Sequence, residues 1–155
     1  VCVVVRDLDR AMQQYWETLG IGPWRVYTYG PPLVKEMTYR GRWQDYRMRL
    51  AFANVGKLVF ELIEPLEGPS LYHEFLEQCG EGIHHFGVFV PNLDAAVAEM
   101  RQRGFEVIMS GRGYGVHGDG GYAYLSTEGT LKAIFELIEI PAERYPPERV
   151  YPTEG

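Results

Sequence analysis

Two short motifs occur twice in this chain, in the same order within each half. Phe-Glu-Leu-Ile-Glu at residues 60–64 recurs at residues 135–139, an offset of 75 positions. Val-Arg-Asp-Leu-Asp at residues 5–9 recurs in related form as Val-Pro-Asn-Leu-Asp at residues 90–94, an offset of 85. Two matches that keep their order indicate a duplicated structural unit. The chain is therefore expected to consist of two related modules.

Each module is predicted to open with a strand and an amphipathic helix. Residues 1–5 are mostly β-branched, and Asp7 stands at an N-cap position before an apolar stripe that ends at Gly20. In the second half, the strand is followed by Asn92 and a similar stripe that ends at Gly104. Turn signals divide the remainder into strands, at residues 24–29, 34–39, 46–54 and 58–64, and at 105–109, 121–126 and 131–140.

These elements predict one domain over residues 1–155. Module one covers residues 1–66, a linker helix lies within 67–81, and module two covers 82–141. A proline-rich tail, 142–155, is expected to be extended on the surface. The two offsets differ by ten residues, which an extra strand and turn in module one, around residues 31–41, would explain.

The composition excludes several classes of function. The net charge of −6 argues against a nucleic-acid partner, because phosphate binding requires clustered Lys and Arg. No apolar run approaches the roughly 20 residues of a membrane span, so no membrane partner is expected. The chain has two cysteines, too few for a disulfide framework, and this favours a reducing, cytoplasmic location.

The repeated Glu61 and Glu136 are the first candidates for chemistry. Alternation along a strand puts Glu61 on one face with Ile63, and Glu136 on the equivalent face with Ile138. A carboxylate among apolar residues is costly to bury unless a partner such as a shared cation compensates it. The alternative is that both acids face solvent on a one-sided sheet, and the duplication favours the first interpretation.

His85 opens the strand of module two and shares a face with Gly87 and Phe89. Its neighbour His84 is expected to point to the other side, so that one of the two faces the acids. A single histidine in a strand is more often a core or edge residue than a ligand, and both readings stay open at this point.

The stretch from His85 to Asp94, His-Phe-Gly-Val-Phe-Val-Pro-Asn-Leu-Asp, resembles the opening of a module in the vicinal oxygen chelate superfamily. That superfamily includes glyoxalase I, methylmalonyl-CoA epimerase, extradiol dioxygenases and the bleomycin-resistance proteins. The resemblance implies an α+β fold, in which two βαβββ modules form a cup-shaped mixed β-sheet with flanking helices. It also implies metal ligands at Glu61, His85 and Glu136, and a further histidine one residue before Val1, outside this sequence.

Within the superfamily, the chain is most similar to the methylmalonyl-CoA epimerase-like proteins. The segment from Glu61 through the linker helix to His85 resembles their linker region, and the loop around His117 resembles theirs. A departure occurs at residues 126–129, where Ser-Thr-Glu-Gly replaces the His-Pro-Lys turn of the epimerases. This departure puts a CoA thioester substrate in doubt.

The resemblance implies a divalent metal (Co, Ni, Mn or Zn) and an enzyme that moves a proton next to a carbonyl. Such an enzyme would be an epimerase, an isomerase or a glyoxalase-like lyase, working as a homodimer on a small-molecule carbonyl substrate, with acyl-CoA among the candidates. One alternative is a metal-free protein that sequesters an aromatic, drug-like ligand. An extradiol-type dioxygenase is a further alternative, less favoured because it uses two histidines and one carboxylate.

Further residues are assigned roles by position. Asp45 and Glu61 are the catalytic candidates for proton transfer, although Asp45 is also compatible with an ordinary solvated turn beside Arg42 and Arg47. Trp24, Tyr46 and His117 are the substrate-binding candidates, and Tyr27, Tyr29 and Trp43 would extend an aromatic pocket. For the aromatic residues the alternative is a role in the core, and for His117 it is a mobile surface position.

Overall fold

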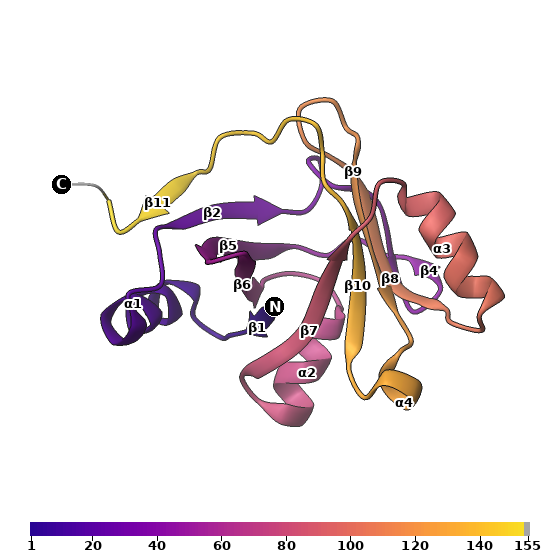
Figure 1. Ribbon diagram of the computed structural model, residues 1–155, viewed down its shortest axis with the longest axis horizontal. Helices are drawn as coiled ribbons and strands as arrows, with labels where there is room; N and C mark the ends of the chain where they lie inside the picture. The colour runs from indigo at the N-terminus through magenta and orange to yellow at the C-terminus, as the bar shows by residue number, and fades with distance from the viewer. Residues whose placement is uncertain (154–155) are drawn as a thin grey trace.

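The computed structural model describes residues 1–153 and joins both modules in one sheet of 11 strands. The sheet is curled: in Figure 1, β2 and β5 run horizontally, whereas β7 to β10 run closer to the vertical. The strand order is β11-β2-β5-β6-β1-β7-β10-β9-β8-β3-β4. The strands are β1 (Cys2–Val4), β2 (Trp24–Tyr29), β3 (Lys35–Tyr39), β4 (Arg42–Trp43), β5 (Met48–Val55), β6 (Leu58–Pro65), β7 (Gly82–Phe89), β8 (Val107–Tyr114), β9 (Gly120–Leu125), β10 (Ile134–Glu139) and β11 (Arg149–Tyr151). The predicted fold class, α+β with a cup-shaped mixed sheet, is confirmed.

The register of the strands follows the sequence repeat. In module one β1 runs parallel to β6 and places Cys2 opposite Glu61. In module two β7 runs parallel to β10 and places Gly87 opposite Glu136. β1 and β7 pair antiparallel and join the modules at the centre of the sheet. Glu61 and Glu136 therefore occupy equivalent positions in the two modules.

Within residues 1–153, four helices accompany the sheet: α1 (Leu8–Leu19), α2 (Leu71–Cys79), α3 (Leu93–Gln102) and the short α4 (Glu128–Leu131). The helices α1 and α3 begin where predicted, since the side chain of Asp7 accepts a hydrogen bond from the Arg10 backbone N–H (3.0 Å) and that of Asn92 accepts one from Ala95 (2.8 Å). The buried stripe of α1 packs on β2, β5 and β6, and that of α3 on β9 and β10. On the opposite, concave face, Leu71, Tyr72 and Leu76 of α2 cover one part, and the remainder is left for a site.

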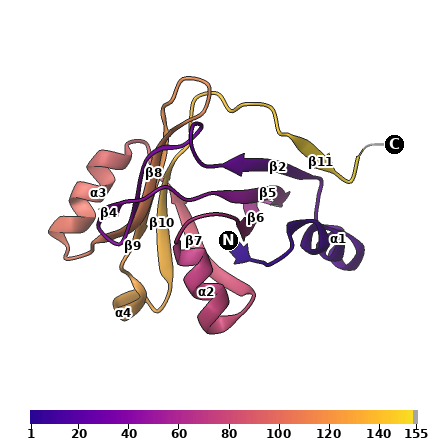
Figure 2. The same cartoon turned by 180° about the vertical axis from the view of Figure 1, so that it is seen from behind.

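The modules exchange edge strands. β3 belongs to module one in sequence but pairs antiparallel with β8 of module two, where the hydroxyls of Thr38 and Ser110 are 2.6 Å apart. In return, β11 pairs antiparallel with β2 of module one. Both exchanges are visible in Figures 1 and 2. The extra strand predicted near residues 31–41 therefore exists, but it completes the sheet of the other module, because the edge of β8 offers unpaired backbone groups.

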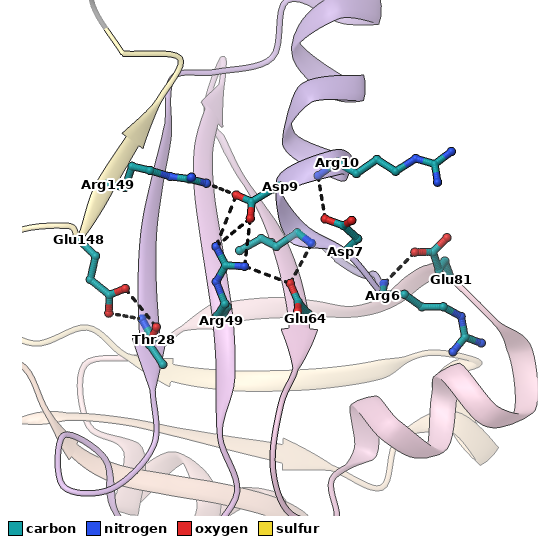
Figure 3. A network of polar contacts seen from close by, with 11 residues as sticks. Arg6, Asp7, Asp9, Arg10, Thr28, Arg49, Glu64, Glu81, Glu148 and Arg149 are labelled. Carbon is teal, nitrogen blue, oxygen red and sulfur yellow. Dashed lines mark hydrogen bonds and ion pairs between the residues drawn. The ribbon is translucent and has the colours of Figure 1, made fainter.

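The tail was predicted to be extended on the surface, and three of its residues form the edge strand β11. Figure 3 shows how polar contacts hold this strand: Arg149 reaches Asp9, and both carboxylate oxygens of Glu148 accept hydrogen bonds from Thr28 (2.9 and 3.1 Å). Arg49 also contacts Asp9, at 3.2 Å. These pairs are exposed, so each contributes about 1 kcal/mol at most. Residues 154 and 155 of the predicted tail lie outside the described residues. Within the described part of the chain, no helix has the length and apolar character needed to span a membrane.

Candidate metal and substrate site

Three ionisable side chains converge on the concave face of the sheet. His85 on β7 places its Nε2 atom 3.1 Å from Oε2 of Glu136 on β10 and 3.5 Å from Oε2 of Glu61 on β6. His85 and Glu136 are buried, and Glu61 is half-buried. The sequence analysis placed these residues on one side of the sheet, and the structure brings them together; their role as metal ligands stays a prediction.

Cys2 is a fourth member of this group, and the sequence analysis missed it. The ligand atoms of Cys2, Glu61 and His85 lie within 4.8 Å of one another. By the register above, Cys2 is the counterpart of Gly87, where an added Cβ would lie 2.8 Å from Ile138. The signal was the alternation in residues 1–5, which places Cys2 on the face of Glu61 once the pairing of β1 with β6 is known.

The charges in this group depend on burial and on one another. Burial raises the pKa of the Cys2 thiol to about 12, although the neighbouring His85 lowers it. Burial also raises the pKa of Glu136, as does Glu61, and the contact with His85 opposes them. Burial would lower the pKa of His85, but Cys2 and Glu136 raise it well above its usual value. The two carboxylates thus favour the protonated form of His85, and a metal ion bound here would have to replace the proton on its Nε2 atom.

His84 does not point away from the site as predicted. Cys2 pairs with His85 but Val3 pairs with Ile83, so His84 is the extra residue of a β-bulge in β7. Its Nδ1 atom lies 2.8 Å from Nδ1 of His85. Burial, followed by the proximity of His85, lowers the pKa of His84 to about 3, so His84 is neutral. A neutral His84 is able to accept the Nδ1–H of His85, which would leave Nε2 of His85 directed at the carboxylates.

Tyrosines form much of the wall of the cavity above this group. The cavity has a volume of about 390 Å³, and we call it the cup; its tyrosines are Tyr27, Tyr29, Tyr72, Tyr114, Tyr122 and Tyr124. The hydroxyls of Tyr72 and Tyr124 are 2.7 Å apart, and that of Tyr124 lies 3.5 Å from Nε2 of His85. Burial raises the pKa of both phenols well above the usual value. They therefore act as neutral hydrogen-bonding groups rather than as bases at neutral pH.

Comparison with known sequence families assigns the chain to a superfamily. The family described as the Glyoxalase/Bleomycin resistance protein/Dioxygenase superfamily matches residues 1–124. The chain belongs to this superfamily. Members of the superfamily typically bind a divalent metal, so the group at the floor of the cup is the place to test for one.

Relatives within the superfamily have low sequence identity. The bovine mitochondrial methylmalonyl-CoA epimerase is 26% identical over 119 residues, which is 76% of this chain and 60% of that protein. The uncharacterized protein YqjC of Bacillus subtilis is 28% identical over 102 residues, which is 66% of this chain and 72% of that protein. The match thus spans less than two thirds of the bovine epimerase, and the activity of that enzyme is not transferred to this chain by similarity alone.

Solved structures support the fold assignment. The methylmalonyl-CoA epimerase of Mycobacterium tuberculosis has a TM-score of 0.65 and 23% identity, covering 91% of this chain and 85% of that one. The Streptomyces coelicolor epimerase in complex with 2-nitronate-propionyl-CoA has a TM-score of 0.63 and 22% identity, covering 94% of both chains. At this level of identity the likeness establishes the superfamily's fold, and the site must be judged on its own residues.

The donor set fits the metal that the superfamily typically binds. Glu61 and Glu136 offer carboxylate oxygens, His85 an imidazole nitrogen and Cys2 a thiol, all on one face of the sheet. Nitrogen, oxygen and sulfur donors suit Zn, Co, Ni and Mn in different degrees. The buried carboxylate of Glu136 lies near a second one, an arrangement that a divalent cation stabilises.

Trp24 does not contact the cup, which corrects its predicted role in substrate binding. Its side chain is fully buried on the other face of β2, between Tyr15 of α1 and Phe60. Tyr27 and Tyr29 lie on the cup face of the same strand. Because side chains alternate, Trp24 and Tyr27 face opposite sides. Trp43 is exposed on β4 and is also absent from the wall of the cup.

Three further predicted site residues lie outside the cup. Asp45 is exposed in the loop between β4 and β5, which corrects its assignment as a catalytic acid. Tyr46 is buried behind the wall, with its hydroxyl 2.7 Å from that of Tyr122, so it supports a lining residue rather than contacting a ligand. His117 is exposed in the loop after β8 and pairs with Glu143 at 3.2 Å. The distance of these loops along the sheet from His85 was not visible in the sequence.

We expect replacement of His84 by phenylalanine to weaken metal binding by about 10- to 100-fold, the range found when the partner of a ligating histidine is removed. Phenylalanine keeps a ring against Phe75 and Tyr72 but cannot accept the Nδ1–H of His85. The measurement is competition with a chromophoric chelator. His117→Phe, at the exposed loop, is the control and should bind metal as the wild type does. Unchanged affinity in His84→Phe would show that the bulge has no part in orienting His85.

Proposed function

We propose that this protein is a metal-dependent enzyme that transfers a proton at the carbon next to a carbonyl group, as an epimerase, isomerase or glyoxalase-like lyase does. The observation that carries the proposal is the meeting of His85 with both Glu61 and Glu136 on the floor of a tyrosine-lined cup. Membership of the superfamily and the similarity to methylmalonyl-CoA epimerases support it.

The metal would be held by Glu61, His85 and Glu136, with the thiol of Cys2 beside them. Co, Ni, Mn and Zn are all compatible with this donor set. When bound, such an ion supplies a Lewis acid that stabilises negative charge on a carbonyl oxygen. The protein's own contribution is to hold the substrate against this group and to exclude water from it, which the burial of His85, Glu136 and the tyrosines accomplishes.

Glu61 is the proposed base: it would serve as a metal ligand in the free protein and would accept the proton as a carboxylate displaced from the metal. It is the less buried of the two carboxylates, with 16% of its side chain exposed against 8% for Glu136, and it lies farther from His85. A carboxylate that is held less tightly and faces the cavity can accept a proton from bound substrate. The hydroxyl of Tyr124, kept neutral by burial, is placed to donate a hydrogen bond to an oxygen near His85.

Two other functions remain as outcomes of the test. The ring of tyrosines would also suit a protein that binds an aromatic ligand without metal. An extradiol-type dioxygenase would require two histidines and one carboxylate, whereas the residues described here bring one imidazole and two carboxylates together. Substrate identity, with acyl-CoA thioesters and other small carbonyl compounds as candidates, and assembly as a homodimer stay predictions.

The test is exchange with solvent. We expect the full-length protein with added metal to incorporate deuterium from D2O at the carbon next to the carbonyl of its substrate, followed by NMR across acyl-CoA thioesters and aromatic α-substituted carbonyl compounds. Exchange should proceed without oxygen uptake. Glu61→Gln at saturating metal should slow exchange by about 100-fold or more, since general bases contribute about 10²–10⁴.

Asp45→Asn is the matched control, because it removes a carboxylate that lies outside the cup. It should exchange at the wild-type rate, and a loss equal to that of Glu61→Gln would assign the base to Asp45 instead. Oxygen uptake with a catechol would place the protein among the dioxygenases. Tight binding of an aromatic ligand with neither metal nor exchange would identify a sequestering protein.

A further inference from the structure

The rim of the cup carries basic side chains that form no ion pair with any residue in 1–153. Three basic side chains line the cavity, Arg25 on β2, Lys57 in the β5–β6 turn and Arg144 in the tail, and we call them the cationic rim. None of them lies within 4.0 Å of a carboxylate among residues 1–153. The chain has a net charge of −6, and most of its other arginines form ion pairs. Cations without an ion-pair partner around one cavity therefore favour the binding of an anion there.

Arg144 is the best positioned of the three. It follows β10 in the tail, which crosses above the sheet toward β11 (Figure 1). It donates a hydrogen bond to the hydroxyl of Tyr29 at 2.9 Å, and its guanidinium lies 5.4 Å from the centre of the Phe52 ring. These two contacts hold the side chain in place while most of its five donors remain free. A half-buried guanidinium fixed in this way is suited to bind an oxyanion.

The pairing of the strands gives an approximate distance from the cationic rim to Glu61 at the bottom of the cup. Arg25 is the register partner of Phe52, Phe52 of Glu61, and Glu61 of Cys2, so these side chains form a row across β2, β5, β6 and β1. Neighbouring strands are about 4.8 Å apart, so roughly 10 Å separates the strand of Arg25 from that of Glu61. Arg144 lies over the Phe52 ring between them.

We propose that Arg144 and Arg25 form an oxyanion-binding subsite, and that the substrate of the cup carries a carboxylate or phosphate one to two strand spacings, about 5–10 Å, from its reacting carbonyl. The part of the substrate beside this subsite is apolar, because Tyr27 and Phe52, whose rings are 6.0 Å apart, form the neighbouring wall. This inference rests on the proposed use of the cup as a substrate site and adds the chemical class of that substrate.

The test measures binding without turnover, so that its failure can be told from failure of the proton-transfer proposal. The probes are 3-(4-acetylphenyl)propionate, its neutral amide, and 4-acetylphenyl phosphate, titrated calorimetrically into the full-length protein. The two acids distinguish a carboxylate from a phosphate source. Variants Arg144→Met and Arg25→Met remove the charge, and Arg101→Met, exposed on α3 and away from the cup, is the control.

We expect at least one acid to bind more tightly than the amide by about tenfold or more, the contribution of a charged hydrogen bond. Arg144→Met should remove this preference, Arg25→Met should reduce it, and Arg101→Met should keep it. Melting temperatures verify folding, and Arg25→Met gives an independent reading if Arg144→Met is unstable. Equal binding of acid and amide, no binding of either acid at millimolar concentration, or a preference that persists in both rim variants would overturn the proposal.

Discussion

Replacing Glu136 by glutamine is expected to lower metal affinity by about 100-fold or more, beyond the loss expected from a partner that only orients a ligand. Glutamine keeps the shape of the side chain but removes the charge, and the carboxylate is the one closest to Nε2 of His85, at 3.1 Å. The fold should persist, because the change also removes a buried charge whose pKa is raised mainly by burial. Metal content after dialysis against a limiting metal buffer measures the effect.

Glu77→Gln is the matched control, since Glu77 is exposed on α2 and takes no part in the cup. It should retain metal as the wild type does. Equal metal content in Glu136→Gln and the wild type would show that Glu136 serves the structure alone, and the metal-dependent function proposed here would then be abandoned.

A second large effect is expected at high pH, where the protein should lose its stability steeply above pH 10. Burial raises the pKa of Tyr29 to about 12 and the pKa values of Tyr72, Tyr122 and Tyr124 well above the usual range. A tyrosine in the unfolded chain ionises near pH 10, so above that pH the unfolded state releases protons that the folded state retains. The stability contributed by these groups is thus complete below pH 10 and falls as pH rises toward the folded pKa values.

Each such tyrosine lowers the free energy of unfolding by about 1.4 kcal/mol per pH unit in this window. Four of them would lower it by about 5 kcal/mol between pH 10 and pH 11. That is comparable with the whole stability of a small domain. Denaturant titrations at pH 8, 10 and 11 measure the loss, together with the absorbance of tyrosinate. In Tyr122→Phe, the free energy of unfolding should fall less steeply with pH, by the equivalent of one proton released on unfolding. Tyr145→Phe, at an exposed position, should keep the slope of the wild type. Tyrosines that ionise near pH 10 in the native state would contradict this account.

The parts of the fold that could be predicted from the sequence depend on local signals. The caps Asp7 and Asn92 and the apolar stripes behind them were sufficient to place α1 and α3, because a helix end is decided within one turn. The repeat of the Glu61 and Glu136 motifs indicated equivalent strands, and the register confirms that equivalence. Alternation alone could also have excluded Trp24 from the cup once Tyr27 was assigned to it.

The parts that could not be predicted depend on pairings between distant strands. The position of Cys2 beside Glu61 follows from the parallel pairing of β1 with β6, which no local pattern encodes. The bulge that turns His84 toward His85 arises from a shift of register between β1 and β7. Asp45 lies outside the cup because the β3–β4 hairpin before it is carried to the far edge of the sheet, a placement decided by β8.

The exchange of edge strands has a consequence for biosynthesis. During translation the edge of β2 stays unpaired until β11 has been synthesised. The two segments are far apart in the sequence, since Glu148, which contacts Thr28, follows it by 120 positions. β3 likewise emerges from the ribosome long before β8, its partner. Pairings of such long sequence separation form late, because the loop must close before the contact is gained. The first module therefore cannot mature ahead of the second, and a nascent chain halted between them would expose bare strand edges prone to aggregation.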